Sequence, residues 1–182
     1  VIHHEFLINK LGSAEDTDKN FLFLIENLSL VGIKAAIVHY FSKADFKYVI
    51  ELFDLIYSKT RTDLYLKYIF SKYMCGEILD SDIQFLEKNL DNLSYKALLG
   101  LIHLASRSDK ALRNTAFDYL DEGFTTLSRN SVIKTIIEKE YIEVMYELKK
   151  YDKLYIYIIK TKNPLKYLYL GLMYDRGLVV VN

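Results

Sequence analysis

The sequence is poor in the residues that interrupt or cross-link a chain. Its 182 residues include one proline, seven glycines, one cysteine and no tryptophan. Sheet-rich domains need more turn residues than this, so the composition favours long helices with tight connections. The lone Cys75 excludes an internal disulfide framework. Because Cys75 precedes a predicted helix end instead of opening a helix, we expect it to be a buried, unreactive thiol.

The chain also lacks an excess of charge of either sign. It has 24 basic and 24 acidic side chains, whereas nucleic-acid-binding modules usually show a stronger basic footprint, so no nucleic-acid partner is predicted. The charge is nevertheless uneven, since residues 147–182 carry seven basic and three acidic side chains. This excess is typical of solvated helix faces; the alternative is a weakly basic C-terminal surface for an acidic partner.

Long apolar runs are missing as well. No run reaches the roughly 18 residues of a membrane span, and the N-terminus has no basic segment typical of a signal peptide. With one cysteine and no predicted span, we expect a cytoplasmic protein. Half of the residues are hydrophobic, which is enough for a sizeable core.

Catalytic motifs are absent from the sequence. It contains no glycine-rich phosphate loop, no G-x-S-x-G and no cysteine pair. The four histidines are too few and too scattered for a helical metal site, and the acidic clusters lie where helix caps are expected. We therefore predict no catalytic residue, no metal and no cofactor. Whether a longer polypeptide carries a catalytic domain elsewhere stays open.

Apolar residues recur mostly at three- and four-residue spacing, which predicts amphipathic helices. Thr17 or Asp18 would cap the first helix, Ser94 another, and Pro164 would open the last. One predicted helix ends at Gly123. Three further helices are expected over residues 128–137, 140–149 and 152–161. The helix starts form two interleaved series, near residues 30, 62, 94 and 129 and near residues 45, 81, 109 and 140.

The spacing within each series is roughly 29–36 residues, which is typical of a repeated helix–turn–helix unit. Each such unit buries its apolar face only by stacking on its neighbours. We therefore predict an all-α fold, a right-handed α-solenoid of antiparallel helix pairs with a period of about 34 residues. Residues 1–182 would form a single domain, part of a longer chain.

Two segments within this pattern have similar sequences. Superposing 64–82 on 165–181 sets Tyr73 on Tyr174 and Gly76 on Gly177, and a weaker copy sets Gly100 on Gly171. Gly76 and Gly177 have the backbone freedom that a helix C-terminus favours. Gly171 lies within a predicted helix, where glycine costs about 0.5–1 kcal/mol relative to alanine, so we expect a neighbouring helix to approach it closely.

The run Leu170-Gly171-x-x-Tyr174-x-x-Gly177 resembles the Sel1-like repeat, a relative of the tetratricopeptide repeat. Val179 stands where that family usually has a second glycine. The resemblance implies an α-solenoid and structural roles for the repeat positions, which are Tyr73, Gly76, Gly100, Gly171, Tyr174 and Gly177.

The predicted function is a non-catalytic scaffold or interaction module that binds a peptide or protein on the concave face of the solenoid. One alternative is an accessory helical domain of a larger enzyme, such as a bacterial glycosyltransferase. Another is a compact helical bundle that captures a partner helix. Homodimerisation stays open. The candidate contact residues are polar or large side chains on the first helix of each pair: Tyr65, Lys67, Lys72, Asn92, Lys96, Arg107, Lys160, Lys162 and Lys166.

Overall fold

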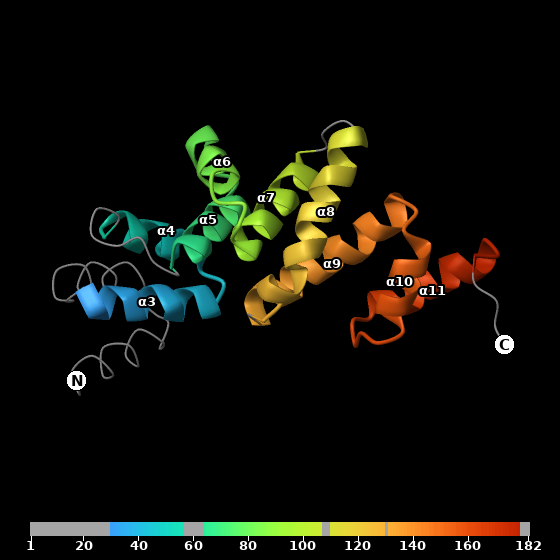
Figure 1. Cartoon of the computed structure of the whole chain (residues 1–182). Helices are drawn as coiled ribbons and strands as arrows, with labels where there is room; N and C mark the ends of the chain where they lie inside the picture. The colour runs from blue at the N-terminus through green and yellow to red at the C-terminus, as the bar shows by residue number, and fades with distance from the viewer. Residues whose placement is uncertain (1–29, 57–63, 107–109, 130, 179–182) are drawn as a thin grey trace. The chain divides into compact units, whose positions relative to one another are not determined.

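The computed structural model describes residues 30–56, 64–106, 110–129 and 131–178. Within these ranges every regular element is an α-helix and no strand occurs, which confirms the all-α prediction (Figure 1). The chain divides into two compact units, an N-terminal one up to Gln84 and a C-terminal one from Phe85, and each is described by itself. The expected helix capped by Thr17 or Asp18 lies outside the described residues.

The N-terminal unit is built around aromatic side chains. It contains α3 (Leu30–Ser42), α4 (Phe46–Asp54), α5 (Leu64–Cys75) and the first residues of α6 (Asp80–Glu87). The rings of Phe41 and Phe70 meet edge to face at 5.9 Å, and the ring of Phe53 stacks on that of Tyr68 at 4.3 Å. These large side chains are fully or almost fully buried, so the apolar stripes of α3, α4 and α5 converge on one core.

A buried ion pair joins α5 to α6 in the same unit. The Lys72 ammonium binds the Asp82 carboxylate, and both side chains are less than 10% exposed. Asp82 also accepts a hydrogen bond of 2.9 Å from the backbone N–H of Leu79 just before α6. The start of α6 is therefore fastened to α5 by charge as well as by packing.

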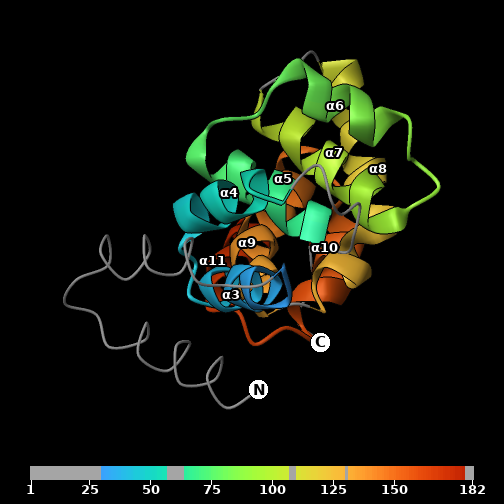
Figure 2. The same cartoon turned by 90° about the vertical axis from the view of Figure 1, so that its left-hand side faces the viewer.

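The C-terminal unit contains α7 (Leu93–Ala105), α8 (Lys110–Leu127), α9 (Ser131–Glu147), α10 (Tyr151–Ile158) and α11 (Leu165–Asp175). Helices α7 and α8 lie side by side in Figure 1 and again in Figure 2. A Cβ atom on Gly100 would stand 2.4 Å from the carbonyl oxygen of Ala116, and one on Gly123 would stand 2.0 Å from that of Leu93. These pairings make α7 and α8 antiparallel, with each glycine admitting the backbone of the other helix.

Several predicted helix boundaries in this unit were wrong. Asn92, not Ser94, caps α7, because its side chain accepts hydrogen bonds from the N–H groups of Ser94 and Tyr95 at 3.0 and 3.3 Å. Gly123 lies inside α8 because close packing against α7 requires a glycine there.

The predicted helices over 128–137 and 140–149 are replaced by the continuous α9, which begins at Ser131. A buried stripe continues through α9 without a break and includes Ile133, Ile137, Tyr141 and Met145. This four-residue spacing keeps one face of the helix in the core along its whole length, so no second helix starts near residue 140. The predicted starts of α4, α6 and α7 lie within two residues of the observed ones. The solenoid and its period stay predictions.

Gly76 and Gly177 have positive φ angles of 73° and 64°, and each follows a helix end. The N–H of Glu77 binds the carbonyl of Lys72 at 2.8 Å, and that of Leu178 binds the carbonyl of Met173 at 2.9 Å. The N–H of Gly76 also binds the carbonyl of Tyr73 at 3.2 Å, and that of Gly177 binds the carbonyl of Tyr174 at 2.9 Å. Together these contacts form Schellman motifs, so α5 and α11 end in the same way.

Gly171 and Cys75 differ from expectation. Gly171 is exposed within α11, and no described atom lies within 4 Å of the place where its Cβ would stand, so the expected close approach is absent there. The close approach occurs instead at Gly100 and Gly123. Cys75 is exposed, not buried, because it ends α5 on the solvent side. Partial desolvation and the nearby Glu77 still raise the pKa of its thiol, which keeps it a weak nucleophile.

Candidate functional site

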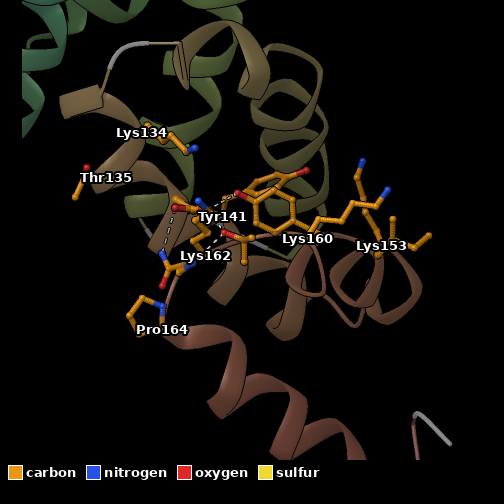
Figure 3. Close-up of a pocket in the computed structure, with 12 residues that line it drawn as sticks. Lys134, Thr135, Tyr141, Lys153, Lys160, Lys162 and Pro164 are labelled. Atoms are coloured by element: carbon orange, nitrogen blue, oxygen red, sulfur yellow. Dashed lines mark hydrogen bonds between the residues drawn. The ribbon is translucent and has the colours of Figure 1, made fainter. Parts of the chain in front are cut away.

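A groove with a volume of about 930 Å³ opens in the C-terminal unit beside α9 and α10 (Figure 3). Its third side is the connection over 159–164, which leads from α10 to α11. We call it the α9–α10 groove. The side chains that line it are Lys134, Thr135, Glu138, Tyr141, Lys153, Ile156, Tyr157, Lys160, Thr161, Lys162, Asn163 and Pro164.

Glu138 on α9 holds the 159–164 connection in place through hydrogen bonds. It is 8% exposed and accepts hydrogen bonds from the Tyr157 hydroxyl at 2.7 Å, the Thr161 hydroxyl at 2.5 Å and the Asn163 amide at 3.3 Å. Asn163 in turn accepts a hydrogen bond of 3.0 Å from the N–H of Leu165 at the start of α11. One buried carboxylate therefore holds the segment that carries Lys160 and Lys162.

The same contacts set the charge of Glu138. Burial raises the pKa of its carboxyl group, but the hydrogen bonds from Thr161, Tyr157 and Asn163, together with Lys134, outweigh burial. The net pKa lies below the ordinary value, so Glu138 is ionised at neutral pH. Because three donors already occupy its oxygens, it is a poor acceptor for a further ligand.

Two tyrosines form the aromatic wall of the groove. The Tyr141 ring stacks on Phe124 with centroids 3.9 Å apart, and the Tyr157 ring meets Tyr141 edge to face at 5.3 Å. Burial raises the pKa of both hydroxyls, and so do the carboxylates that accept their hydrogen bonds, Asp121 for Tyr141 and Glu138 for Tyr157. Both hydroxyls therefore stay protonated donors.

The rim of the groove is cationic. Lys153 pairs with Asp121, so its charge is compensated. Lys134, Lys160 and Lys162 are exposed and form no ion pair with any described residue. The groove thus presents three ammonium groups to solvent around the ionised Glu138 carboxylate, whose oxygens already accept three hydrogen bonds.

An apolar side chain shares this rim. Ile156 lines the groove and is 55% exposed, although α10 buries Leu154 and Ile158 completely on its other side. The groove therefore combines positive charge with a solvent-exposed aliphatic contact.

The predicted contact residues are only partly brought together. Lys160 and Lys162 lie in the groove, and Lys166 lies next to it, with its ammonium 3.3 Å from the carbonyl oxygen of Thr161. In the N-terminal unit, Tyr65 and Lys72 are buried, which removes them from any accessible surface.

Three of the remaining predicted contacts, Lys67, Asn92 and Lys96, have structural partners in their own unit. The Lys67 ammonium lies 5.6 Å from the centre of the Phe41 ring. Asn92 is the cap of α7, and Lys96 pairs with Glu122 at 2.5 Å. Arg107 lies outside the described residues.

Sequence reasoning missed Lys134, Glu138, Tyr141 and Ile156. The first three follow one another at four- and three-residue spacing, which places them on one face of a helix. That signal was hidden because the chain was predicted to break between residues 137 and 140. Ile156 has no sequence signal, since its neighbours Leu154 and Ile158 are equally apolar.

Comparison with family models, curated proteins and solved structures gave no match. The Sel1-like resemblance therefore stays a prediction. Among the residues that the structure describes, no group of three or more His, Cys, Asp or Glu side chains could hold a metal ion. No helix in the described ranges is both long enough and apolar enough to cross a membrane.

The lowered pKa of Glu138 predicts a pH-dependent stability. A carboxyl group with a depressed pKa stabilises the fold fully above its ordinary value near 4.5, and this contribution is lost as the pH falls through the folded value. At neutral pH we expect Glu138→Gln to lower the free energy of unfolding by about 1.5–3 kcal/mol, the range for hydrogen bonds to charged groups. Urea denaturation from pH 7 to pH 3 should show the difference from the wild type shrinking below about pH 4.5.

Glu140 on the same helix is the matched control. Burial, Glu143 and Glu147 raise the pKa of its carboxyl group against the opposing effect of Lys139. Its ionised form therefore opposes folding, and Glu140→Gln should leave stability at neutral pH unchanged or higher. Equal pH profiles for the two variants would contradict the assigned contacts of Glu138.

Proposed function

We propose that this chain is a non-catalytic interaction module that binds a segment of another protein in the α9–α10 groove. The observation that carries the proposal is the rim of the groove, where three exposed lysines without a described ion-pair partner surround an exposed isoleucine. Charged and apolar groups left open together in a concave site favour binding of a ligand that supplies the missing partners.

The protonation states of the carboxyl and hydroxyl groups that line the groove do not favour catalysis there. A general base works best when its pKa lies near the operating pH. The pKa of Glu138 is lowered and its oxygens are occupied, whereas the pKa values of the Tyr141 and Tyr157 hydroxyls are raised. These groups hold the groove together and do not accept or release protons at neutral pH.

The resemblance to Sel1-like repeats supports the same proposal, since helical-repeat arrays offer extended binding surfaces. The two echoing segments, which end at Gly76 and Gly177, finish their helices in the same Schellman motif. In the proposed function, the helical repeats form the scaffold and the α9–α10 groove contacts the segment of the other protein.

A peptide selection tests the proposal. The purified chain would be used to select binders from a random peptide library, and their dissociation constants would be measured for two double variants. Lys160→Glu with Lys162→Glu reverses the rim of the groove. Lys88→Glu with Lys139→Glu reverses two exposed lysines that do not line it and changes the net charge equally.

We expect the selected peptides to bind the groove variant at least about tenfold more weakly, which corresponds to 1.4 kcal/mol. The control variant should bind as the wild type does. A library that yields no binder, or binders that lose affinity equally in both variants, would overturn the proposal.

A further inference from the structure

The charge of the α9–α10 groove restricts its occupant. Its exposed ionic groups without a described ion-pair partner are the ammonium groups of Lys134, Lys160 and Lys162. The carboxylate that lines the groove, Glu138, is 8% exposed and already has three donors. An entering carboxylate would therefore meet three exposed ammonium groups and only one buried carboxylate, whereas an entering cation would be repelled.

The apolar surface of the groove restricts the occupant further. Ile156 lines the groove and is 55% exposed. Beside Ile156 lies the half-buried ring of Tyr157. A ligand that covers Ile156 removes aliphatic surface from water, a gain that a purely polar ligand does not obtain.

The kind of cationic side chain in the groove also restricts the occupant. None of the arginines in the described part of the chain lines the groove, although the guanidinium fork is the group that suits phosphate best. A nucleic acid or free phosphate would use the lysines and leave Ile156 exposed to water. The volume of about 930 Å³ lies within the range of ligand-binding clefts.

From this geometry, and resting on the proposed function, we infer that the groove takes an acidic protein segment with an apolar side chain in its middle. Lys134, Lys160 and Lys162 pair with its carboxylates, and Ile156 contacts the apolar side chain. Glu138 is a positioning residue, because it fixes the segment that bears two of the three lysines.

Fluorescence anisotropy with four labelled ten-residue peptides tests the inference. The first contains glutamates around a central leucine, and the second has serine in place of that leucine. The third has glutamine in place of every glutamate, and the fourth has lysine. We expect the first peptide to bind about tenfold more tightly than each of the others. An unlabelled ten-nucleotide single-stranded DNA and inorganic phosphate would serve as competitors and should displace it only weakly.

Two variants assign the contacts. Ile156→Ser should reduce the affinity for the leucine peptide to that for the serine peptide, while Leu112→Ser, at a leucine on α8 that is 59% exposed, should change nothing. Tightest binding of the glutamine or lysine peptide, changed by reversal of Lys160 and Lys162 but not by the Lys88 and Lys139 control, would overturn this inference and leave the proposed function standing. Efficient displacement by DNA or phosphate would overturn the inference in favour of a phosphate ligand. Failure of all four peptides, together with an unproductive library selection, would overturn both.

Discussion

Replacement of Asp82 by alanine is expected to lower the free energy of unfolding of the N-terminal unit by about 3–5 kcal/mol, the range for removing one partner of a buried ion pair. The substitution leaves the Lys72 ammonium charged in a site where its side chain is only 7% exposed. It also removes the acceptor of the Leu79 N–H, which lies 2.9 Å from the Asp82 carboxylate. Losing both contacts frees the start of α6 from α5.

Urea denaturation would measure the total loss, and native-state hydrogen exchange of the α5 and α6 amides would locate it. The matched control is the exposed pair Lys47–Glu51, whose atoms are 3.8 Å apart and whose side chains are 81% and 39% exposed. Glu51→Ala should cost less than about 0.5 kcal/mol, because solvent screens such i,i+4 pairs.

The double variant Lys72→Met with Asp82→Asn separates charge from packing. It removes both charges and keeps an oxygen acceptor for the Leu79 N–H, so much of the stability lost in Asp82→Ala should return. If Asp82→Ala costs no more than Glu51→Ala, the buried pair does not form in solution.

Replacement of Gly123 by alanine is the second large expected effect. The added Cβ would stand 2.0 Å from the carbonyl oxygen of Leu93 and 2.7 Å from the Cβ of Ala97, so the two helices must separate. Forced overpacking of this kind typically costs about 1–3 kcal/mol, and the backbone contact places Gly123→Ala at or above the upper end. Gly100→Ala should act in the same direction, since its Cβ would stand 2.4 Å from the carbonyl oxygen of Ala116.

Gly171→Ala is the control, because Gly171 also lies inside a helix but has open space around its missing Cβ among the described residues. Alanine should stabilise α11 by about 0.5–1 kcal/mol, the helix-interior difference between the two residues. Thermal and urea unfolding of the three variants would measure these opposite signs. A neutral Gly123→Ala would mean that α7 and α8 do not pack as closely as described. A destabilising Gly171→Ala would mean that a further helix approaches Gly171.

Helix positions could be predicted from the sequence largely because they depend on local periodicity. The stripe of α4, with Val49, Ile50 and Phe53 buried, follows the three- and four-residue spacing of its apolar residues. The errors arose where a residue favoured at helix ends served another purpose. Gly123 resembles a helix terminator but is required by a neighbouring backbone, which no local pattern reveals.

In the α9–α10 groove, too, the sequence predicted some of the residues and not others. Lys160 and Lys162 could be singled out as polar residues late in a basic segment, and both line it. Lys134 and Glu138 could not be placed with them, because 24 residues separate Glu138 from Lys162 and only the packing of α9 against α10 closes that interval. In the N-terminal unit, Lys72 was grouped with surface lysines although it is buried, since its partner Asp82 lies ten residues away on another helix.

The sequence by itself determined that the described chain is helical, approximately where its helices begin, and that Gly76 and Gly177 would follow helix ends. These properties depend on residues within one or two turns of each other, where spacing and backbone freedom act directly. Only the tertiary structure decided which lysines are buried, which glycines admit a neighbouring helix and which side chains share a groove. Those outcomes depend on contacts between separate helices, and the energy of such contacts is set by side-chain volume and charge at distances that sequence spacing does not encode.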